Sequence, residues 1–313
     1  MRGDEKMADA MRVEVESQIG ILRKRLKKAH AGKVGGVHKS RTELRRIRTE
    51  LDTMGHTAYG SGVMARLAER LRDAERSLAK TRDVDVLLAD LRAHARDAAR
   101  GDAQSLGAVI ARLEARRGRS AKRARKALNR RARDELAGAV RVAMKPKNVV
   151  ALRPKNPARA APELVRHFMH QEVWRRYDAL RAYDARLPAD VATLHKLRSA
   201  CRELRFTLEA FEDAAPGLAP IARALHRLQD EMGELHDHQI AIDLLERWLH
   251  KRKIARSRAL DRYLARRAEA RDELRSRSEP RWLGVLGETF RLRLARALEP
   301  DARATDREPL LAA

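Results

Sequence analysis

Two segments of the chain carry histidine and arginine at one shared spacing. In each segment a histidine is followed by arginines three, seven and ten residues later, which gives the sets His38, Arg41, Arg45, Arg48 and His195, Arg198, Arg202, Arg205. Arginine binds phosphate bidentately and stays protonated, whereas the charge of histidine depends on pH. Together these residue types can bind phosphate groups.

Each set forms one stripe if its segment is helical. At about 100° per residue, the histidine and the three arginines of a set fall on a narrow arc of the helix surface. The stripe is roughly 15 Å long, because ten residues of helix rise by that amount. This length can follow several consecutive phosphates of an extended chain.

Apolar residues border each stripe instead of lying opposite it. They are Val37, Leu44, Ile47, Leu51 and Met54 beside the first stripe, and Leu194, Leu197, Cys201, Leu204, Leu208 and Phe211 beside the second. We therefore expect the arginines to point along a groove where helices meet, with their stems partly covered. Like charges spaced four residues apart on a helix repel each other, so something anionic should compensate them.

The sequence suggests two sources of negative charge that could compensate the arginines. A phosphate polymer bound along the stripes is one. The other is a structural network of ion pairs with carboxylates of the chain, for which the candidates are Asp52, Asp83, Glu209 and Asp237. Under either reading, partial pairing would orient the guanidinium groups.

The elements that must hold these stripes are helices. Ala, Leu, Arg and Glu dominate, and alternating β-branched or aromatic runs are nearly absent, which predicts an all-α fold. The expected helices cover residues 13–30, 37–54, 63–78, 84–100, 106–142, 163–186, 191–211, 218–234, 239–256, 260–276 and 281–298.

The second stripe belongs to a wider internal repeat. The two stripes are 157 residues apart, and a second block, Leu67 to Leu88, aligns with Ile221 to Ile242 at an offset of 154. A Pro-rich basic stretch separates the two copies. The predicted organisation is a first helical half at 13–144, a linker at 145–162, a second helical half at 163–298 and a mobile tail at 299–313.

Charge and composition narrow the class of partner. The chain has 313 residues, with 69 Lys and Arg against 44 Asp and Glu, a net charge of +25 that attracts polyanions. The one cysteine, Cys201, excludes an intrachain disulfide framework and is expected in the core. The sequence contains no long apolar run and no apolar signal segment, so we expect a cytoplasmic protein with no membrane contact.

Four ordered motifs resemble the CHAD domain, the conserved histidine α-helical domain. They are the segment from His38 to Arg48, the segment Arg82-Asp83-Val84-Asp85-Val86, the segment from His195 to Phe206, and the segment from Leu228 to Asp237. The resemblance covers roughly Val13 to Leu298. It implies two helical bundles related by a pseudo-two-fold axis, enclosing a basic channel that binds inorganic polyphosphate, and localisation to polyphosphate granules.

Carried over residue by residue, the resemblance implies nine ligand contacts: His38, Arg41, Arg45, Arg46, Arg48, His195, Arg198, Arg202 and Arg205. Two positions depart from the family pattern. Phe206 stands where Tyr is more usual, and His236 replaces the more usual Asn. Neither departure removes a guanidinium group.

Other chemistries are weaker fits to the sequence. His167 with His170 lacks an evident third metal ligand, and the neighbours in the run His236-Asp237-His238 point to different faces of a helix. No nucleotide or nucleophile motif is present, so no metal, cofactor or enzymatic activity is expected. The alternatives are a phosphohydrolase, phosphotransfer through His38 or His195, and binding of the backbone of duplex nucleic acid. Aromatic residues make up only 4% of the chain, which leaves little for base stacking.

Overall fold

A computed structural model of the chain describes residues 1–149, 164–183, 191–251 and 253–299. Most of the predicted linker and all but the first residue of the predicted tail lie outside this range. The division into two halves joined at residues 145–162 therefore stays a prediction.

The prediction of an all-α fold is confirmed. Across the described ranges the only β-type pairing is an isolated bridge between Lys6 and Leu164. The helices are α1 (Met7–His30), α2 (Val34–Glu50), the π-helix η1 (Leu51–Gly55), α3 (His56–Tyr59), α4 (Ser61–Asp97), α5 (Arg100–Ala127), α6 (Arg130–Ala143), the 3-10 turn η2 (Pro146–Asn148), α7 (Val165–Arg181), α8 (Val191–Ala210), α9 (Leu218–His250), α10 (Arg258–Leu286) and α11 (Glu288–Leu298).

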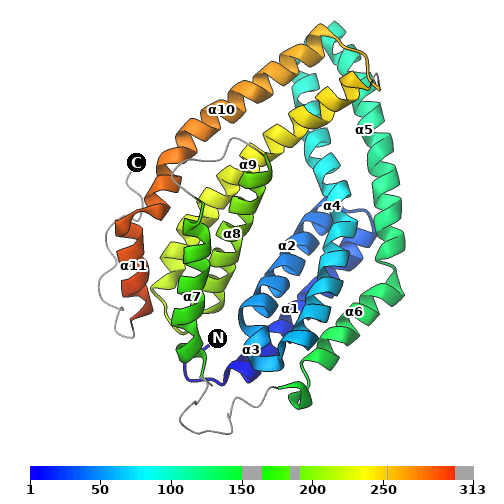
Figure 1. Ribbon diagram of the computed structural model, residues 1–313. Coiled ribbons are helices and arrows are strands. Elements are labelled where there is room, and N and C mark those ends of the chain that lie inside the picture. Colours follow the sequence, from blue (N-terminus) through cyan, green and yellow to red (C-terminus); the bar gives the residue numbers. More distant parts are fainter. Residues whose placement is uncertain (150–163, 184–190, 252, 300–313) are drawn as a thin grey trace.

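Two groups of helices stand side by side (Figure 1). In the first, α1, α2, α4, α5 and α6 follow one another, and in the second, α7, α8, α9, α10 and α11 follow in the same manner. The long hairpins α4–α5 and α9–α10 meet at one end of the molecule, where a small apolar cluster includes Leu91, Leu113, Trp248 and Tyr263. This parallel order fits the predicted duplication, which remains a prediction.

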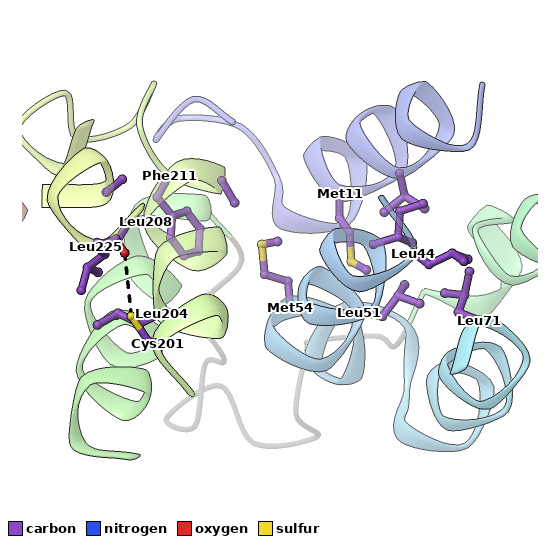
Figure 2. Close-up of a cluster of buried hydrophobic side chains, with 14 of the residues drawn as sticks. Met11, Leu44, Leu51, Met54, Leu71, Cys201, Leu204, Leu208, Phe211 and Leu225 are labelled. Atoms are coloured by element: carbon purple, nitrogen blue, oxygen red, sulfur yellow. Dashed lines mark hydrogen bonds between the residues drawn. The ribbon is translucent and has the colours of Figure 1, made fainter. Parts of the chain in front are cut away.

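The predicted apolar arcs form the core at the base of both groups. Every residue named for the two arcs is buried, from Val37 to Met54 on the first and from Leu194 to Phe211 on the second. Figure 2 shows residues of α2 and η1 packed with Met11 and Leu71 on one side, and residues of α8, followed by Phe211, packed with Leu225 on the other. Because these arcs are fixed inward, the basic stripes beside them face the junction of the two groups.

Two long helices are continuous where the sequence suggested breaks. The expected gaps between residues 78 and 84 and between 234 and 239 were wrong, since α4 and α9 run through them. Neither stretch contains glycine or proline, and buried residues such as Leu78 and Val84 continue the apolar face of α4. The carboxylates near residues 83 and 237 therefore lie on rigid helices.

Two other helix boundaries also differ from expectation. The helix expected over residues 106–142 is divided at Asn129, whose side chain accepts a hydrogen bond from the Ala132 N–H and caps α6. Conversely, α10 continues through Pro280 to Leu286, because Leu274 and Trp282 are buried on either side of it. None of the helices in the described ranges is long and apolar enough to cross a membrane.

A close contact between α1 and α2 sets the position of the first stripe. Gly32, at φ 78°, allows the short turn between the two helices. Two residues before His38, a Cβ on Gly36 would lie 2.6 Å from the Ala29 nitrogen, so only glycine allows α2 to approach the end of α1 this closely. The turn thus fixes where the basic stripe begins.

Candidate functional site

The stripes of α2 and α8 face each other at the junction of the two helix groups. The two helices contact each other directly. Burial lowers the pKa values of His195, Arg198 and Arg202 on α8, and the charge of Arg45 on α2 lowers all three further. Helices α4 and α9 lie beside the stripes and contribute Glu75, Arg82, Asp83, His236 and Asp237 to the same cluster. We call the facing stripes, except Arg205, together with these neighbours the basic cluster.

The histidine is the most exposed residue of each stripe, and along α8 the exposure falls further toward the last arginine. His38 and His195 are exposed at one end of the cluster. Arg48 is partly covered at the far end of α2, whereas Arg202 and Arg205 on α8 retain only 6% and 5% of their surface. A ligand would therefore meet the histidines first and the α8 arginines last.

The arginines of α2 have carboxylate partners on α4. Arg41 Nη1 lies 3.5 Å from Asp83 Oδ1. Arg45 binds Glu75 through its Nε, and Arg48 Nη1 donates to the other oxygen of Glu75 at 2.7 Å. Burial alone would raise the pKa of Glu75, but Arg45 and Arg48 outweigh it and hold that pKa below its usual value. Glu75 is thus a charged brace for the first stripe.

The arginines of α8 are not matched in the same way. In the part of the chain that the structure describes, no carboxylate lies within ion-pair distance of Arg198 or Arg202, and the Nε of each is buried without a hydrogen-bond partner. Arg198 instead lies against α9, where a Cβ on Gly233 would be 3.0 Å from its Nη2. Gly233 therefore provides room for a guanidinium group that forms no ion pair with the described residues and is balanced only through space, chiefly by Asp237.

Burial, together with mutual repulsion, lowers the pKa values of arginines in the basic cluster. Burial lowers the pKa of Arg202 to about 9, and the charges of Arg45 and Arg198 add to this effect. Burial and the charge of Arg45 lower the pKa of Arg41 to about 10, against the opposing charge of Asp83. These groups stay protonated at neutral pH, so the cluster holds an excess of positive charge that an anion would relieve.

Three histidines lie among these arginines. Burial lowers the pKa of His38 and of His195, and the surrounding arginines lower both further. The ring of His236 on α9 lies 5.4 Å from that of His195, and burial together with Arg198 lowers its pKa to about 4. The histidines are thus neutral at pH 7 and can donate one hydrogen bond each.

Arg46 and Arg205 form a separate arrangement at the junction. Both guanidinium groups bind Glu209, with Arg205 Nη1 at 3.0 Å from Oε1 and Arg46 on Oε2. Both also stack on the ring of Phe206, at 4.8 Å for Arg46 and 4.5 Å for Arg205. This confirms the expected pairing of Glu209 with the stripes and joins α2 to α8.

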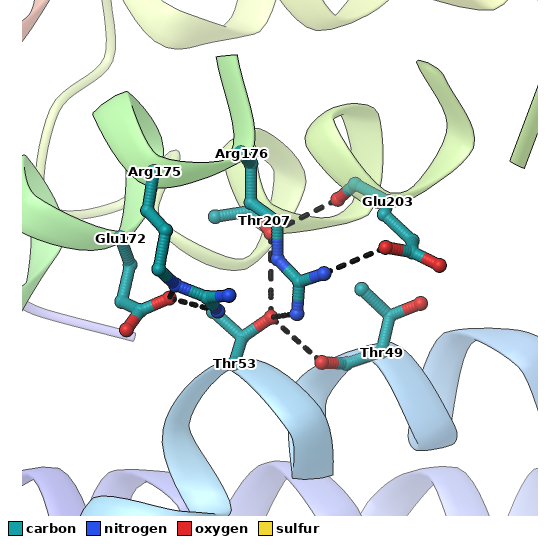
Figure 3. Close-up of polar contacts among 7 residues, drawn as sticks. All are labelled: Thr49, Thr53, Glu172, Arg175, Arg176, Glu203 and Thr207. Carbon is teal, nitrogen blue, oxygen red and sulfur yellow. Dashed lines mark hydrogen bonds and ion pairs between the residues drawn. The ribbon is translucent and has the colours of Figure 1, made fainter. Parts of the chain in front are cut away.

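A second polar contact joins α7 to both stripes' helices (Figure 3). Arg176 donates to Glu203 on α8 at 2.6 Å and to the Thr53 hydroxyl of η1 at 3.0 Å. Thr53 in turn donates to the carbonyl of Thr49, in the last turn of α2, at 2.7 Å. The junction is therefore held by buried hydrogen bonds that fix the spacing of the stripes.

The structure brings together seven of the nine predicted residues in the basic cluster: His38, Arg41, Arg45, Arg48, His195, Arg198 and Arg202. Arg46 and Arg205 lie in the neighbouring Glu209 arrangement, and their role in binding stays a prediction. Sequence reasoning did not assign Glu75, Arg82, His236 or Gly233 to the site. The last three stand inside the recognised motifs, which is the signal that would have pointed to them.

The remaining candidates give no competing site. Among the described residues no three His, Cys, Asp or Glu side chains gather closely enough to hold a metal ion. Cys201 is buried, as predicted, and burial raises the pKa of its thiol to about 12. A buried neutral thiol suits a core position.

The sequence matches the family model of the CHAD domain over residues 15–246. The chain belongs to the CHAD domain family. The fold is also similar to that of a solved structure, PptA from Streptomyces chartreusis, with a TM-score of 0.57 and 19% sequence identity over 94% of this chain and 99% of that chain. At this identity the likeness concerns the fold alone. No curated protein sequence matches the chain significantly.

The matched residues of the CHAD domain contain the whole basic cluster. They run from α1 to near the end of α9, and thus include α2, α4 and α8. Helices α10 and α11 lie beyond the matched range.

Proposed function

We propose that this CHAD protein binds inorganic polyphosphate, without transforming it, between the stripes of α2 and α8. The observation that carries the proposal is the pair Arg198 and Arg202. Each has a buried Nε without a hydrogen-bond partner and, among the described residues, no carboxylate within ion-pair distance, and both lie near the charges of the α2 arginines. A buried charge without a partner destabilises a fold, commonly by about 3–5 kcal/mol when its partner is removed. A polyanion bound between the stripes would supply the missing negative charge.

A single flexible chain fits this cluster better than a wide polyanion. Arg202 and Arg205 are nearly covered by protein, so we expect only a thin ligand that enters from the exposed His38 and His195 end to reach them. Polyphosphate has one phosphate in every unit and no bulky base. Membership of the CHAD family fits the same ligand.

Nucleic acid is the rival ligand, and the aromatic residues argue against its single-stranded form. Phe206, the one aromatic residue that interrupts a stripe, is fully buried and covered by two guanidinium groups, so it offers no face for base stacking. Labelled long-chain polyphosphate displaced by duplex DNA, RNA or tripolyphosphate at fixed salt compares the ligands directly. A preference for either nucleic acid would contradict the proposal.

The central test reverses the charge of the cluster. We expect the variant Arg41→Glu, Arg45→Glu, Arg198→Glu, Arg202→Glu to lose polyphosphate binding while it keeps its helical circular-dichroism spectrum. The control changes four exposed arginines elsewhere by the same total charge: Arg66→Glu, Arg70→Glu, Arg227→Glu and Arg277→Glu. We call this the charge-matched control.

The control separates a specific site from general attraction. It should bind polyphosphate with only the loss that a smaller net charge causes. Undiminished binding by the folded cluster variant, or equal losses in both variants, would refute the assignment of the site.

Two further parts of the proposal have tests of their own. Purified protein should release no phosphate from polyphosphate, with or without divalent metal, and steady release would show a hydrolase. In cells we propose that the protein associates with polyphosphate granules in the cytoplasm. A fluorescent fusion should form foci that disappear when polyphosphate synthesis is removed.

A further inference from the structure

A second concentration of positive charge lies far from the basic cluster, on α5 and the start of α6. Between residues 112 and 133 the sequence has eleven Lys and Arg side chains and a single acidic one, Glu114. Glu114 is already paired with Arg92 of α4. This surface therefore carries much of the chain's excess charge, and the proposed site does not use it.

Six of these cations form one stripe along α5. At about 100° per residue they fall within an arc of about 120°, and the stripe is roughly 21 Å long. We call it the α5 ridge, and its members are Arg112, Arg116, Arg119, Lys122, Arg123 and Lys126. All are exposed except Arg116, which is partly covered.

The α5 ridge has little internal compensation. Arg112 and Arg116 stack over the ring of Trp248 at 5.5 and 5.7 Å, which orients them without neutralising them. For the other four cations, no ion pair or hydrogen bond to another described side chain is present. A row of like charges without partners is unfavourable on a free helix and becomes favourable beside a polyanion.

The surroundings of the ridge favour a soluble polyanion over a membrane. A helix that lies in a lipid surface pairs its basic residues with exposed apolar ones. The large apolar side chains exposed in the described ranges belong to other segments, such as Val13, Val142 and Leu292, and none lies on α5. The ridge is thus suited to bind a soluble polyanion through electrostatic contacts, without apolar ones.

The ridge and the basic cluster lie on opposite sides of one helix pair. Asp83 of α4 faces Arg41 in the cluster, whereas Asp85, two residues later, binds Arg117 of α5. The α5 ridge is on the side of α5 away from Arg117, so about two helix diameters, roughly 20–25 Å, separate it from the cluster. A long polymer can span this distance, and a ligand of three phosphates cannot.

We propose that the α5 ridge binds a second section of the same polyphosphate chain whose first section occupies the basic cluster. The inference rests on the proposed function. Because the second contact is intramolecular once the first has formed, it acts at a high effective concentration. The protein would therefore select long chains, since only these engage both surfaces.

The test compares chain lengths in two variants of equal charge. The ridge variant Arg119→Glu, Lys122→Glu, Arg123→Glu, Lys126→Glu alters exposed side chains only, and the charge-matched control alters four others. Relative to this control, we expect the ridge variant to bind long-chain polyphosphate at least about tenfold more weakly, with a salt-dependence slope reduced by about 3, since each lost phosphate contact removes about 0.7. Its affinity for tripolyphosphate should equal that of the control.

Each other outcome has a distinct meaning. Equal long-chain affinity and equal salt slope in the two variants would overturn the role of the ridge while leaving the basic cluster as the site. A ridge variant that loses binding of duplex DNA, but not of polyphosphate, would overturn the choice of ligand. Failure of the wild-type protein to bind polyphosphate of any length would instead refute the proposed function.

Discussion

The basic stripes of α2 and α8 have the same residues at the same spacing but different surroundings. On α2, Arg41 faces Asp83, and Arg45 and Arg48 share Glu75. On α8, Arg198 and Arg202 have no such partner among the described residues. The shared spacing gives both helices the same positive charge. How much of this charge is neutralised depends on the carboxylates of the helix packed beside each stripe, α4 for α2 and α9 for α8.

The predicted repeat offers a reason for this difference. At the offset of 154 that aligns Asp83 with Asp237, Glu75 aligns with Gln229. The carboxylate that braces the α2 stripe is thus an uncharged amide in the second half, and Gln229 Oε1 is buried without a hydrogen-bond partner. The α2 stripe is organised by carboxylates of the protein itself, whereas the α8 stripe has uncompensated charge that, in our proposal, a bound polyphosphate neutralises.

The largest expected effect follows from neutralising one stripe at a time. Arg198→Gln with Arg202→Gln should weaken polyphosphate binding by about 100-fold or more, because each charged hydrogen bond contributes about 1.5–3 kcal/mol. Arg41→Gln with Arg48→Gln should cost only about tenfold, since these groups already share their charge with Asp83 and Glu75. Titration of both variants at one salt concentration compares them, and equal losses would remove the distinction between the stripes.

The next effect concerns stability without ligand. Glu75→Gln leaves Arg45 and Arg48 without their carboxylate, and we expect the free energy of unfolding to fall by about 2–3 kcal/mol. Added polyphosphate should restore more stability to this variant than to the wild type, because the ligand then replaces the lost charge. Glu114→Gln, which breaks the exposed pair with Arg92, is the control and should change stability by less than about 0.5 kcal/mol. A similar loss in both variants, measured by denaturant unfolding, would mean that Glu75 is not a brace.

Much of the site could be predicted from sequence because most of its residues lie on two short helices, each with a regular pattern of apolar and basic residues. The apolar arcs determine which faces of α2 and α8 are buried, and the residues next to them, such as Arg41 and Arg198, must then lie at the margin. Helical geometry within one segment is enough for this step. The all-α fold follows from composition in the same local way.

The partners of the arginines could not be predicted in the same manner. That Glu75 rather than Asp52 meets Arg45 depends on the rotation of α4 against α2, which no pattern within one helix specifies. The meeting of Arg46 and Glu209, which are 163 residues apart, depends on how the two helix groups pack. Alignment of the two copies pairs Glu75 with Gln229. The consequence of this difference could not be predicted, because only the structure shows that Glu75 binds Arg45 and Arg48.

A substitution at Gln229 tests the difference between the two stripes from the other direction, and its expected effect on stability is smaller. If Gln229 faces the α8 stripe as Glu75 faces the α2 stripe, then Gln229→Glu supplies the missing carboxylate. We expect the free energy of unfolding to rise by about 1 kcal/mol and polyphosphate affinity to fall about tenfold, since the uncompensated charge of the α8 stripe is then neutralised. Gln229→Met, similar in length but uncharged, is the control and should leave affinity within about twofold. Lower stability in the glutamate variant would refute the correspondence between the two positions.

The smallest expected effect is a dependence of stability and of affinity on pH through His236. This residue of α9 aligns with Arg82 of α4 at the offset of 154. The pKa of His236 is about 4 in the folded protein, because of burial and the charges of Arg198, His195, Arg45 and Arg41, against about 6.5 when unfolded. The unfolded chain therefore binds more protons, so this contribution to stability is complete above pH 6.5 and is lost as the pH falls toward 4.

Bound polyphosphate should reverse the sign of this effect. A polyanion beside His236 raises the pKa of the imidazole, so binding takes up protons and becomes tighter as the pH falls from 7 toward 5. His236→Asn removes the titrating group and keeps a hydrogen-bond donor, so its affinity should vary less with pH than that of the wild type, while His38, His195 and Asp237 still titrate in both proteins. Calorimetry in buffers of different ionisation enthalpy measures the proton uptake directly. Equal uptake in the two proteins would show that His236 stays neutral beside the ligand, and would place the pH response with the exposed histidines at the start of the stripes.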